Sequence, residues 1–141
     1  MQRHRTDVCG MSNVATTIPQ VRIFGGSPEE VRSVRDFVGR LADGCPVADD
    51  IVLLASELAT NAVVHTASGR DGTFSVVVRA DDTWARVEVH DLGSDIAPAV
   101  RLAASPEESG AGLGLVEMLA DRWGFYGGPS GRVVWFEMGW R

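Results

Sequence analysis

The sequence has few of the features that mark a secreted, membrane-spanning or metal-binding protein. Its longest apolar run, "IVLLA", is far shorter than the roughly 20 residues that span a bilayer. The N-terminus also lacks the apolar core of about 7–15 residues that is typical of signal peptides. The two cysteines, Cys9 and Cys45, have no metal-ligand spacing. These absences favour a protein of the reducing cytoplasm that does not bind membranes.

Positive charge is scarce as well. The chain holds 13 basic and 19 acidic residues, which gives a formal net charge of −6 and a sequence pI near 4.9. Nucleic acids and anionic membranes are bound mainly by clustered Lys and Arg side chains. Direct nucleic-acid binding is therefore not expected, whereas the basic surface of a protein partner would be compatible with this charge.

The length and composition fit one folded domain. The chain has 141 residues, of which 45% are hydrophobic and 23% charged, and this amount of chain buries one ordinary core. Residues 1–16 show no hydrophobic period and mixed polar content, so we expect a flexible tail there. Residues 17–141 are expected to form the domain.

Two helices are predicted in the first half of the domain, after an edge strand in "IPQVRIF". The segment from Gly25 to Gly44 has Ser27 as a candidate N-cap, Pro28 at the first helical position and Glu30 as the capping-box partner. The second helix is predicted from near Pro46 to about residue 67. The apolar stripes expected to be buried are Val31, Val34, Val38 and Leu41 in the first helix and Ile51, Leu54, Leu58 and Ala62 in the second.

The second helix carries a polar pair. Glu57 and Asn61 are four residues apart, on a face that also holds Leu53 and Val64. Residues at this spacing stack on one side of a helix, so a carboxylate and an amide project together from a mostly apolar surface. A solvated stripe or a helix–helix contact would also account for such a pair.

Two strands follow, joined by a turn at residues 81 and 82. In "TFSVVVRA" and "TWARVEVHD" apolar and polar residues alternate. Asp91 falls on the same side as Val87 and Val89, so this carboxylate is predicted to point toward the core. The alternative is that Asp91 simply begins a turn with Gly93.

The third region is rich in glycine. Residues 92–110 have no sustained period, and a connection of this length within a domain is usually functional or disordered. It leads into "GAGLGLVEML", a short helix with Leu115, Met118 and Leu119 on one face, and then into two strands around a Gly-Pro-Ser-Gly turn. A lone Gly-x-Gly does not by itself define a phosphate site. The order of elements favours helices packed on one face of a mainly antiparallel sheet.

The joint order of these features resembles a known family. "ELATNAVVHT", "DLG", "GAGLGLVEMLADRWGF" and "GRVVWFEM" are similar to the N box, the G1 box, the G2 box and the closing strand of the histidine-kinase-like ATPase superfamily. The most similar branch is that of the small anti-sigma-factor serine kinases. The resemblance covers roughly residues 17–139. It implies the Bergerat ATP-binding fold, a two-layer α/β sandwich with helices on one face of a mixed, mainly antiparallel sheet.

The resemblance also implies roles for individual residues and implies ATP and Mg²⁺ as cofactors. Asn61 would be the metal ligand, and an amide oxygen suits a cation that prefers oxygen and keeps several waters. Glu57 would be the general base, and Asp91 would accept the exocyclic amine of adenine. Gly93 would let the base approach the backbone, and residues 94–110 would form a lid. The loop and helix start that would enclose the phosphates comprise Gly110, Gly112, Leu113, Gly114 and Leu115.

The sequence departs from the family pattern in two places. Asp95 stands where the G1 box usually has a second glycine. The closing strand offers Val133 or Val134 where a threonine often faces the adenine-binding aspartate. Both departures bear on nucleotide affinity more than on the fold.

Two classes of function remain open. In the first, the protein is a Mg-ATP-dependent serine kinase that sequesters a sigma factor and phosphorylates an anti-sigma antagonist. In the second, it is a binding module of the same fold that regulates a partner by contact alone. The presence of both Glu57 and Asn61 favours the kinase, whereas Asp95 favours the module. A homodimer is compatible with either class.

Overall fold

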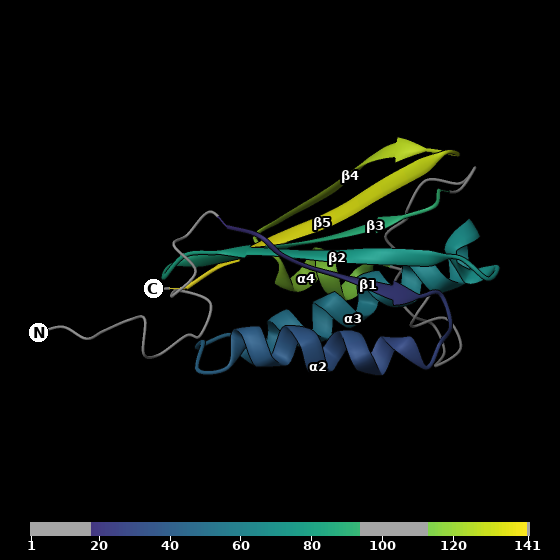
Figure 1. The fold of residues 1–141 in the computed structure, drawn as a ribbon. Coiled ribbons are helices and arrows are strands. Elements are labelled where there is room, and N and C mark those ends of the chain that lie inside the picture. The colour runs from purple at the N-terminus through teal and green to yellow at the C-terminus, as the bar shows by residue number, and fades with distance from the viewer. Residues whose placement is uncertain (1–17, 94–112, 141) are drawn as a thin grey trace, which may run out of the picture.

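The computed structural model describes residues 18–93 and 113–140, and in these ranges the helices lie on one side of a single sheet (Figure 1). The strands are β1 (Gln20–Gly25), β2 (Thr73–Ala80), β3 (Trp84–Asp91), β4 (Arg122–Gly128) and β5 (Gly131–Gly139). The helices are α2 (Glu30–Ala42), α3 (Ala48–His65) and α4 (Gly114–Leu119), with a short 3₁₀-helix η2 (Ala67–Gly69) after α3. The predicted order of elements is confirmed.

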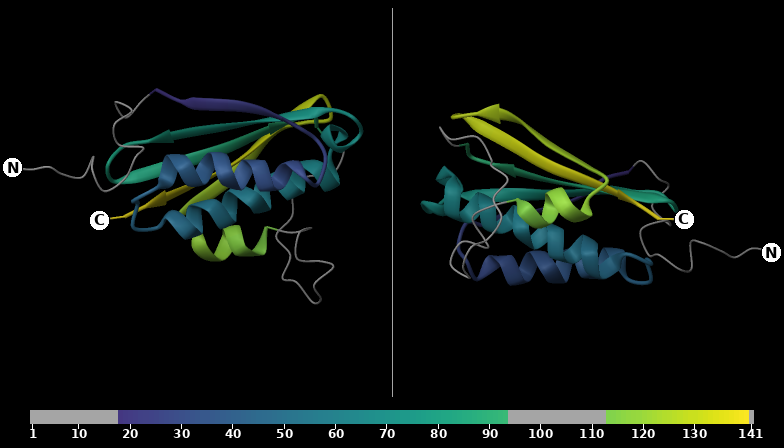
Figure 2. Two further views of the ribbon diagram at one scale, coloured as in Figure 1. Left: turned by 60° about the horizontal axis from the view of Figure 1, so that its bottom comes forward. Right: turned by 180° about the vertical axis from the view of Figure 1, so that it is seen from behind.

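The sheet has the strand order β1-β2-β3-β5-β4, with each neighbouring pair antiparallel. The predicted edge strand is β1, and Phe24 on it stacks against Phe74 of β2 with ring centroids 5.6 Å apart. The two-layer α/β class is thus confirmed, and the described strands form an antiparallel sheet where the prediction allowed a mixed one. Figure 2 shows α2, α3 and α4 side by side under one face, while none of the helices in the described ranges lies on the other face.

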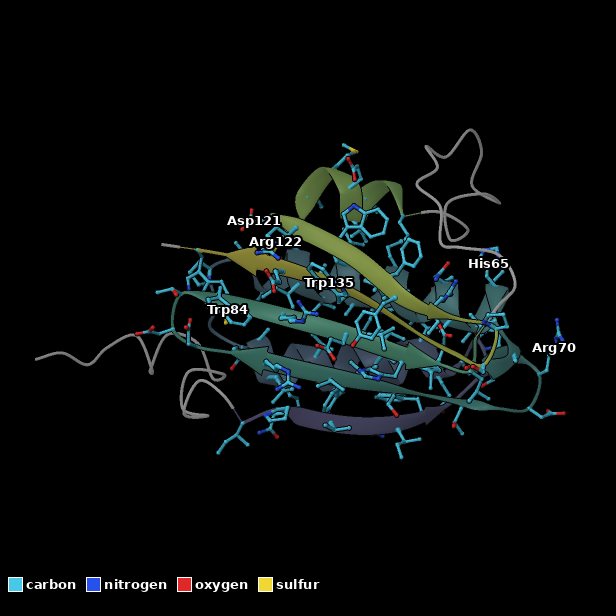
Figure 3. All side chains as sticks on the ribbon, turned by 90° about the horizontal axis from the view of Figure 1, so that it is seen from above. His65, Arg70, Trp84, Asp121, Arg122 and Trp135 are labelled. Carbon is cyan, nitrogen blue, oxygen red and sulfur yellow. The ribbon has the colours of Figure 1, made fainter. Side chains whose placement is uncertain are left out.

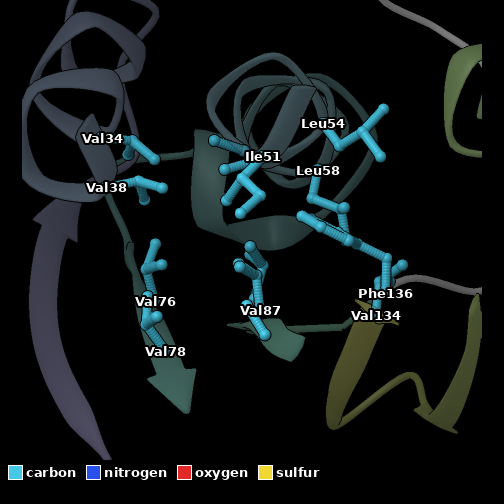
Figure 4. Close-up of a cluster of buried hydrophobic side chains, with 14 of the residues drawn as sticks. Val34, Val38, Ile51, Leu54, Leu58, Val76, Val78, Val87, Val134 and Phe136 are labelled. Atoms are coloured by element: carbon cyan, nitrogen blue, oxygen red, sulfur yellow. The ribbon is translucent and has the colours of Figure 1, made fainter. Parts of the chain in front are cut away.

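The core lies between the sheet and the helices (Figure 4). Alternation along the strands and the helical period place the predicted apolar side chains toward one another, which confirms both patterns. The innermost side chains, each no more than 2% exposed, include Val34 and Val38 of α2, Ile51, Leu54 and Leu58 of α3, Val76 and Val78 of β2, Val87 of β3, and Val134 and Phe136 of β5. Ala62 is equally buried, whereas Val31 and Leu41 are only partly buried.

The start of α2 differs from the predicted capping box. Residues 28 and 29 form a turn, and the helix begins at Glu30 without a hydrogen bond from a capping side chain. The Glu30 amide donates to the backbone carbonyl of Ser27 at 3.0 Å. The carboxylate of Glu30 instead accepts from the amide of Gly25 at 3.3 Å. Glu30 therefore joins the helix to the end of β1 rather than closing a box with Ser27.

Helix α4 buries a side chain that does not belong to the apolar face noted in its sequence. Leu115 is 37% exposed and Met118 is 68% exposed, whereas Val116 is fully buried. The helix has only six residues, so it completes fewer than two turns, and Leu113 just before it supplies the other buried anchor. A segment this short leaves several faces compatible with the same apolar residues.

The apolar runs and the cysteines of the chain bear on two of the predictions. No helix within the described ranges is long and apolar enough to cross a membrane. Cys45 is buried and disulfide-bonded, which differs from the reduced thiol that the sequence favoured. The chain's other cysteine, Cys9, lies outside the described residues, as does the predicted tail.

Candidate functional site

The candidate residues gather at one end of the sheet. Strand β3 begins at Trp84 and ends at Asp91, and α3 ends at His65. Figure 3 shows His65 and Arg70 at the opposite end of the molecule from Trp84 and Asp121. The end of β3 that carries Asp91 therefore lies beside the end of α3.

The polar pair of α3 lies at the margin of the core. Asn61 is 2% exposed, and its side-chain Nδ2 has no hydrogen-bond partner in the described part of the chain. Glu57 is half-buried, and burial raises the pKa of its carboxyl above the ordinary value. Leu53 and Val64 on the same face are exposed. A buried amide nitrogen without a hydrogen-bond partner is unfavourable, so a ligand that accepted its hydrogen bonds would be stabilised here.

Asp91 points inward, as the strand period predicted, and its side chain is 0% exposed. Its Oδ1 accepts a hydrogen bond from the Gly93 amide at 2.7 Å, and its Oδ2 accepts one from Nε of Arg132 at 3.1 Å. Burial raises the pKa of Asp91, although the Gly93 amide and the Arg132 charge act in the opposite direction. The two interpretations of Asp91 are compatible, because the side chain faces the core and also begins the turn.

Gly93 has a backbone conformation that requires glycine. Its φ is +97°, and a Cβ at this position would lie 2.5 Å from the carbonyl oxygens of Gly128 and Pro129. The close approach that the structure shows is thus to the turn between β4 and β5. Approach of a base to Gly93 stays a prediction.

The short helix η2 connects the two halves of the site. Oγ of the buried Ser68 donates to the carbonyl of Thr73 at 2.8 Å and accepts from the amide of Leu92 at 2.9 Å. The Ala67 amide donates to the carbonyl of Gly93 at 3.0 Å. The end of the helix that carries Asn61 is therefore hydrogen-bonded to the turn that follows Asp91.

Sequence reasoning missed this connection. The available signal was the segment "TASG" directly after α3, because Thr and Ser commonly hydrogen-bond to the nearby backbone. Thr66 Oγ1 accepts from the Ser68 amide at 3.1 Å. Gly69 also leaves no room for a side chain, since a Cβ there would lie 1.9 Å from the carbonyl oxygen of Val63.

The glycine-rich segment is described only at its end. Leu113 is fully buried, Gly114 is the buried first residue of α4, and Leu115 is exposed. Helix α4 contacts α3, which places this segment on the same side of the sheet as Asn61. Gly110, Gly112, Asp95 and the predicted lid at 94–110 lie outside the described residues.

The residue that faces Asp91 was predicted wrongly. Strand pairing places Arg132 of β5 opposite Asp91, while Val133 and Val134 lie opposite His90 and Val89. The side chain of Arg132 is 2% exposed, so an arginine rather than a valine contacts the carboxylate. The sequence held a partial signal, because Arg132 shares the inward side with Val134 under the strand period.

The donor set is suited to magnesium only together with a ligand. Among the described residues, no group of three or more His, Cys, Asp or Glu side chains could enclose a metal ion. Magnesium usually keeps several waters and takes one or two protein oxygens together with nucleotide phosphates. A single buried amide at Asn61 fits that pattern, and it does not fit a metal site built from protein alone.

The comparisons with known proteins agree with this geometry. Residues 24–138 match the family described as "Histidine kinase-like ATPase domain", and the chain belongs to that family. The match includes Glu57, Asn61, Asp91 and Gly114, which defines the class as an ATPase-type nucleotide-binding domain.

The fold is also found in solved structures. The RsbU and RsbW domains of Rv1364c from Mycobacterium tuberculosis superpose with a TM-score of 0.61 at 22% sequence identity. The likeness covers 86% of this chain but only 32% of that one, so this chain spans about a third of the length of its neighbour. No curated protein matches the chain.

Proposed function

We propose that this protein is a regulatory Mg-ATP-dependent serine kinase that acts as an anti-sigma factor. The observation that carries the nucleotide assignment is the buried Asn61 amide, whose Nδ2 lacks a partner in the described part of the chain. Asn61 projects from the same face of α3 as Glu57, and this chain is a member of the histidine kinase-like ATPase family. A polar group of this kind, held in place at the margin of a core, is typical of a ligand site.

The nucleotide-binding roles proposed for these residues come from the family resemblance. Asn61 would hold the metal through its amide oxygen, and the backbone near Leu113, Gly114 and Leu115 would lie along the phosphates. Asp91 would accept a hydrogen bond from the adenine amine. When bound, Mg-ATP supplies the phosphoryl group and neutralises charge that develops during its transfer. The hydrogen bonds through η2 fix the helix and the strand relative to each other, which keeps the two ends of the site in register.

Glu57 is the proposed general base. As the hydroxyl oxygen of an acceptor serine forms its bond to the γ-phosphorus, the bond from that phosphorus to the leaving ADP oxygen breaks. The hydroxyl proton passes to the Glu57 carboxylate. Partial burial raises the pKa of Glu57, which makes its ionised form a better proton acceptor.

The proposed partners are proteins of the transcription machinery. The net charge of −6 opposes direct binding to nucleic acid. The solved neighbour contains an RsbW domain, and the N, G1 and G2 boxes resemble those of anti-sigma-factor kinases. We therefore assign a sigma factor and a serine-bearing antagonist as binding partners, with the protein acting in the cytoplasm. Homodimerisation is compatible with this role.

A second function is a binding module of the same fold that does not transfer phosphate. The observation that favours it is the ion pair between Asp91 and Arg132, because a carboxylate already bonded to an arginine is less available to a base. In this alternative the protein regulates its partner by contact alone.

Phosphate transfer separates the two functions. The protein would be incubated with radiolabelled Mg-ATP and with the small proteins that co-purify with it from its own host. Glu57→Gln should lower the rate of transfer to serine on the order of 10²–10⁴-fold, because a general base acts mainly in the transition state. ATP affinity should stay close to that of the unsubstituted protein. Glu29→Gln, an exposed glutamate before α2, is the matched control and should transfer phosphate normally.

Each outcome assigns one function. Equal rates in the unsubstituted protein and in Glu57→Gln would show that Glu57 is not the base. ATP binding without transfer in both proteins would establish the binding module instead.

A further inference from the structure

Arg132 is the charged residue nearest to the proposed base-recognition group. It lies directly across from Asp91 at the end of the β3–β5 pairing, and its Nε is 3.1 Å from Asp91 Oδ2. Both side chains are almost completely buried. Arginine is rarely buried unless it is paired, so the contact is specific rather than incidental.

Both oxygens of Asp91 already accept a hydrogen bond. The Gly93 amide bonded to Oδ1 belongs to the turn itself and keeps its place when a ligand arrives. The donor to Oδ2 is the side chain of Arg132 and not the backbone of the turn. Oδ2 is therefore the oxygen at which a donor from a ligand would meet Arg132.

An adenine amine and a guanidinium need the same partner. Both groups only donate hydrogen bonds, and a guanidinium keeps its positive charge at every physiological pH. We propose that Arg132 is an affinity-determining residue that competes with adenine for Asp91, so that ATP binds only when Arg132 leaves the carboxylate. The proposal rests on the nucleotide-binding function proposed above.

Fold stability does not account for an arginine at this position. Apolar residues of similar volume commonly replace buried ion pairs without loss of stability, because desolvation offsets most of the attraction. The next pair along the inward face of β3 and β5 is Val89 opposite Val134, and both side chains are almost fully buried. The Asp91–Arg132 pair thus lies at the end of an otherwise apolar face, where the base would bind.

Calorimetric titration with Mg-ATP tests the competition. Arg132→Met removes the charge and keeps an unbranched side chain of similar length. We expect its ATP dissociation constant to be lower than that of the unsubstituted protein by about tenfold or more, since Asp91 loses its competing partner. The free protein should melt at a lower temperature, because the substitution leaves a buried carboxylate without its ion pair. Adding Asp91→Asn to Arg132→Met should remove the gain in affinity.

Arg122→Met is the matched control. Arg122 lies on β4 of the same hairpin, but its side chain is 72% exposed and its carboxylate neighbour is Glu137. This substitution should leave ATP affinity unchanged. A structural role for Arg132 alone would instead lower the melting temperature and weaken ATP binding together.

The outcomes separate the two proposals. Equal or weaker ATP binding by Arg132→Met, with binding by the unsubstituted protein, overturns the competition and leaves nucleotide binding in place. Absence of binding in every folded variant overturns both. If Arg132→Met does not fold, nuclear magnetic resonance of the unsubstituted protein decides the question. The Arg132 Nε–H signal should shift and lose its protection from solvent exchange when ATP is added, and an unchanged signal at saturating ATP contradicts the proposal.

Discussion

Two arginine–carboxylate pairs join β3 to β5, and they lie on opposite faces of the sheet. Asp91 and Arg132 face the helices, whereas Arg86 and Glu137 face the side without helices, and each pair is directly opposed across the strands. The Arg86–Glu137 contact measures 2.8 Å and the Asp91–Arg132 contact 3.1 Å. Similar chemistry on the same two strands therefore exists in two different environments.

The outer pair belongs to a larger network. Arg86 also donates to Glu88 at 2.8 Å, and Nε2 of His90 lies 2.8 Å from the second oxygen of Glu88. The guanidinium of Arg86 lies 4.1 Å from the ring centroid of Trp135, a cation–π contact. Figure 3 shows Trp135 and Arg122 on this face. The outer charges thus have several partners, whereas Asp91 has the Gly93 amide and Arg132.

The pKa of Asp91 on the inner face and the pKa of Glu88 in the outer network shift in opposite directions. Burial raises the pKa of Asp91 in spite of its partners. Burial would also raise the pKa of Glu88, but hydrogen bonds from His90 and Arg86 and their charges outweigh it, so the pKa of Glu88 is lowered. The fold therefore stabilises the ionised form of Glu88 and not that of Asp91. A buried carboxylate whose ionised form is not fully stabilised gains from a further hydrogen-bond donor, and such groups are typical of ligand sites.

Removing one carboxylate from each pair should give the largest contrast. Asp91→Ala removes the carboxylate that is bonded to the buried Arg132 and should lower the free energy of unfolding by about 3–5 kcal/mol. Glu137→Ala leaves Arg86 with Glu88 and with access to water, so its effect should be about 1 kcal/mol or less. Urea denaturation measures both values. Equal losses would show that the two faces do not differ in this respect.

A substitution in the turn next to Asp91 should have the next largest effect. Gly93→Ala places a side chain at a positive φ and against the β4–β5 turn. It should lower the free energy of unfolding by about 1–3 kcal/mol. Gly128→Ala is the matched control, since nothing lies within 4 Å of a Cβ built there. Its effect should stay within about 0.5 kcal/mol. Thermal unfolding of the two variants measures the difference, and a harmless Gly93→Ala would contradict the packing described here.

The pH dependence of stability should give the smallest contrast. The lowered pKa of Glu88 means that its stabilising contribution is present above its ordinary pKa of 4.5 and is lost as the pH falls below it. The raised pKa of Asp91 has the opposite sign, because stability falls as the pH rises from its ordinary 3.8 toward the folded value. Glu88→Gln should therefore reduce the loss of stability in acid, and Asp91→Asn should increase it. Denaturation at a series of pH values tests both signs, and shifts of the same sign would contradict the assignment.

Strong local periods explain what the sequence predicted well. Alternation in β3 showed that Asp91 faces inward, and the spacing of Glu57 and Asn61 placed them on one helix face. Both inferences depend on residues close together in the chain. The catalytic and ligand roles came from the family resemblance, because spacing alone does not distinguish a metal ligand from a residue that merely packs.

The contacts that sequence reasoning missed depend on residues far apart in the chain. Arg132 meets Asp91 only through the register of β5 on β3, and no local pattern specifies the pairing of two residues that are 41 positions apart in the sequence. The bond from Ser68 to Leu92 likewise joins segments that meet only after folding. The buried residue of α4, Val116, was not identified from the sequence, because six residues do not define a period.

Titration of the folded protein with ATP, with and without Mg²⁺, tests the central claim most directly. The unsubstituted protein and Asn61→Ala would be compared up to millimolar ATP, with Thr60→Ala as the control from the neighbouring helix position. The account predicts that the unsubstituted protein and Thr60→Ala bind ATP in a Mg²⁺-dependent manner and that Asn61→Ala does not. Binding by Asn61→Ala that matches the unsubstituted protein in affinity and Mg²⁺ dependence would contradict the site.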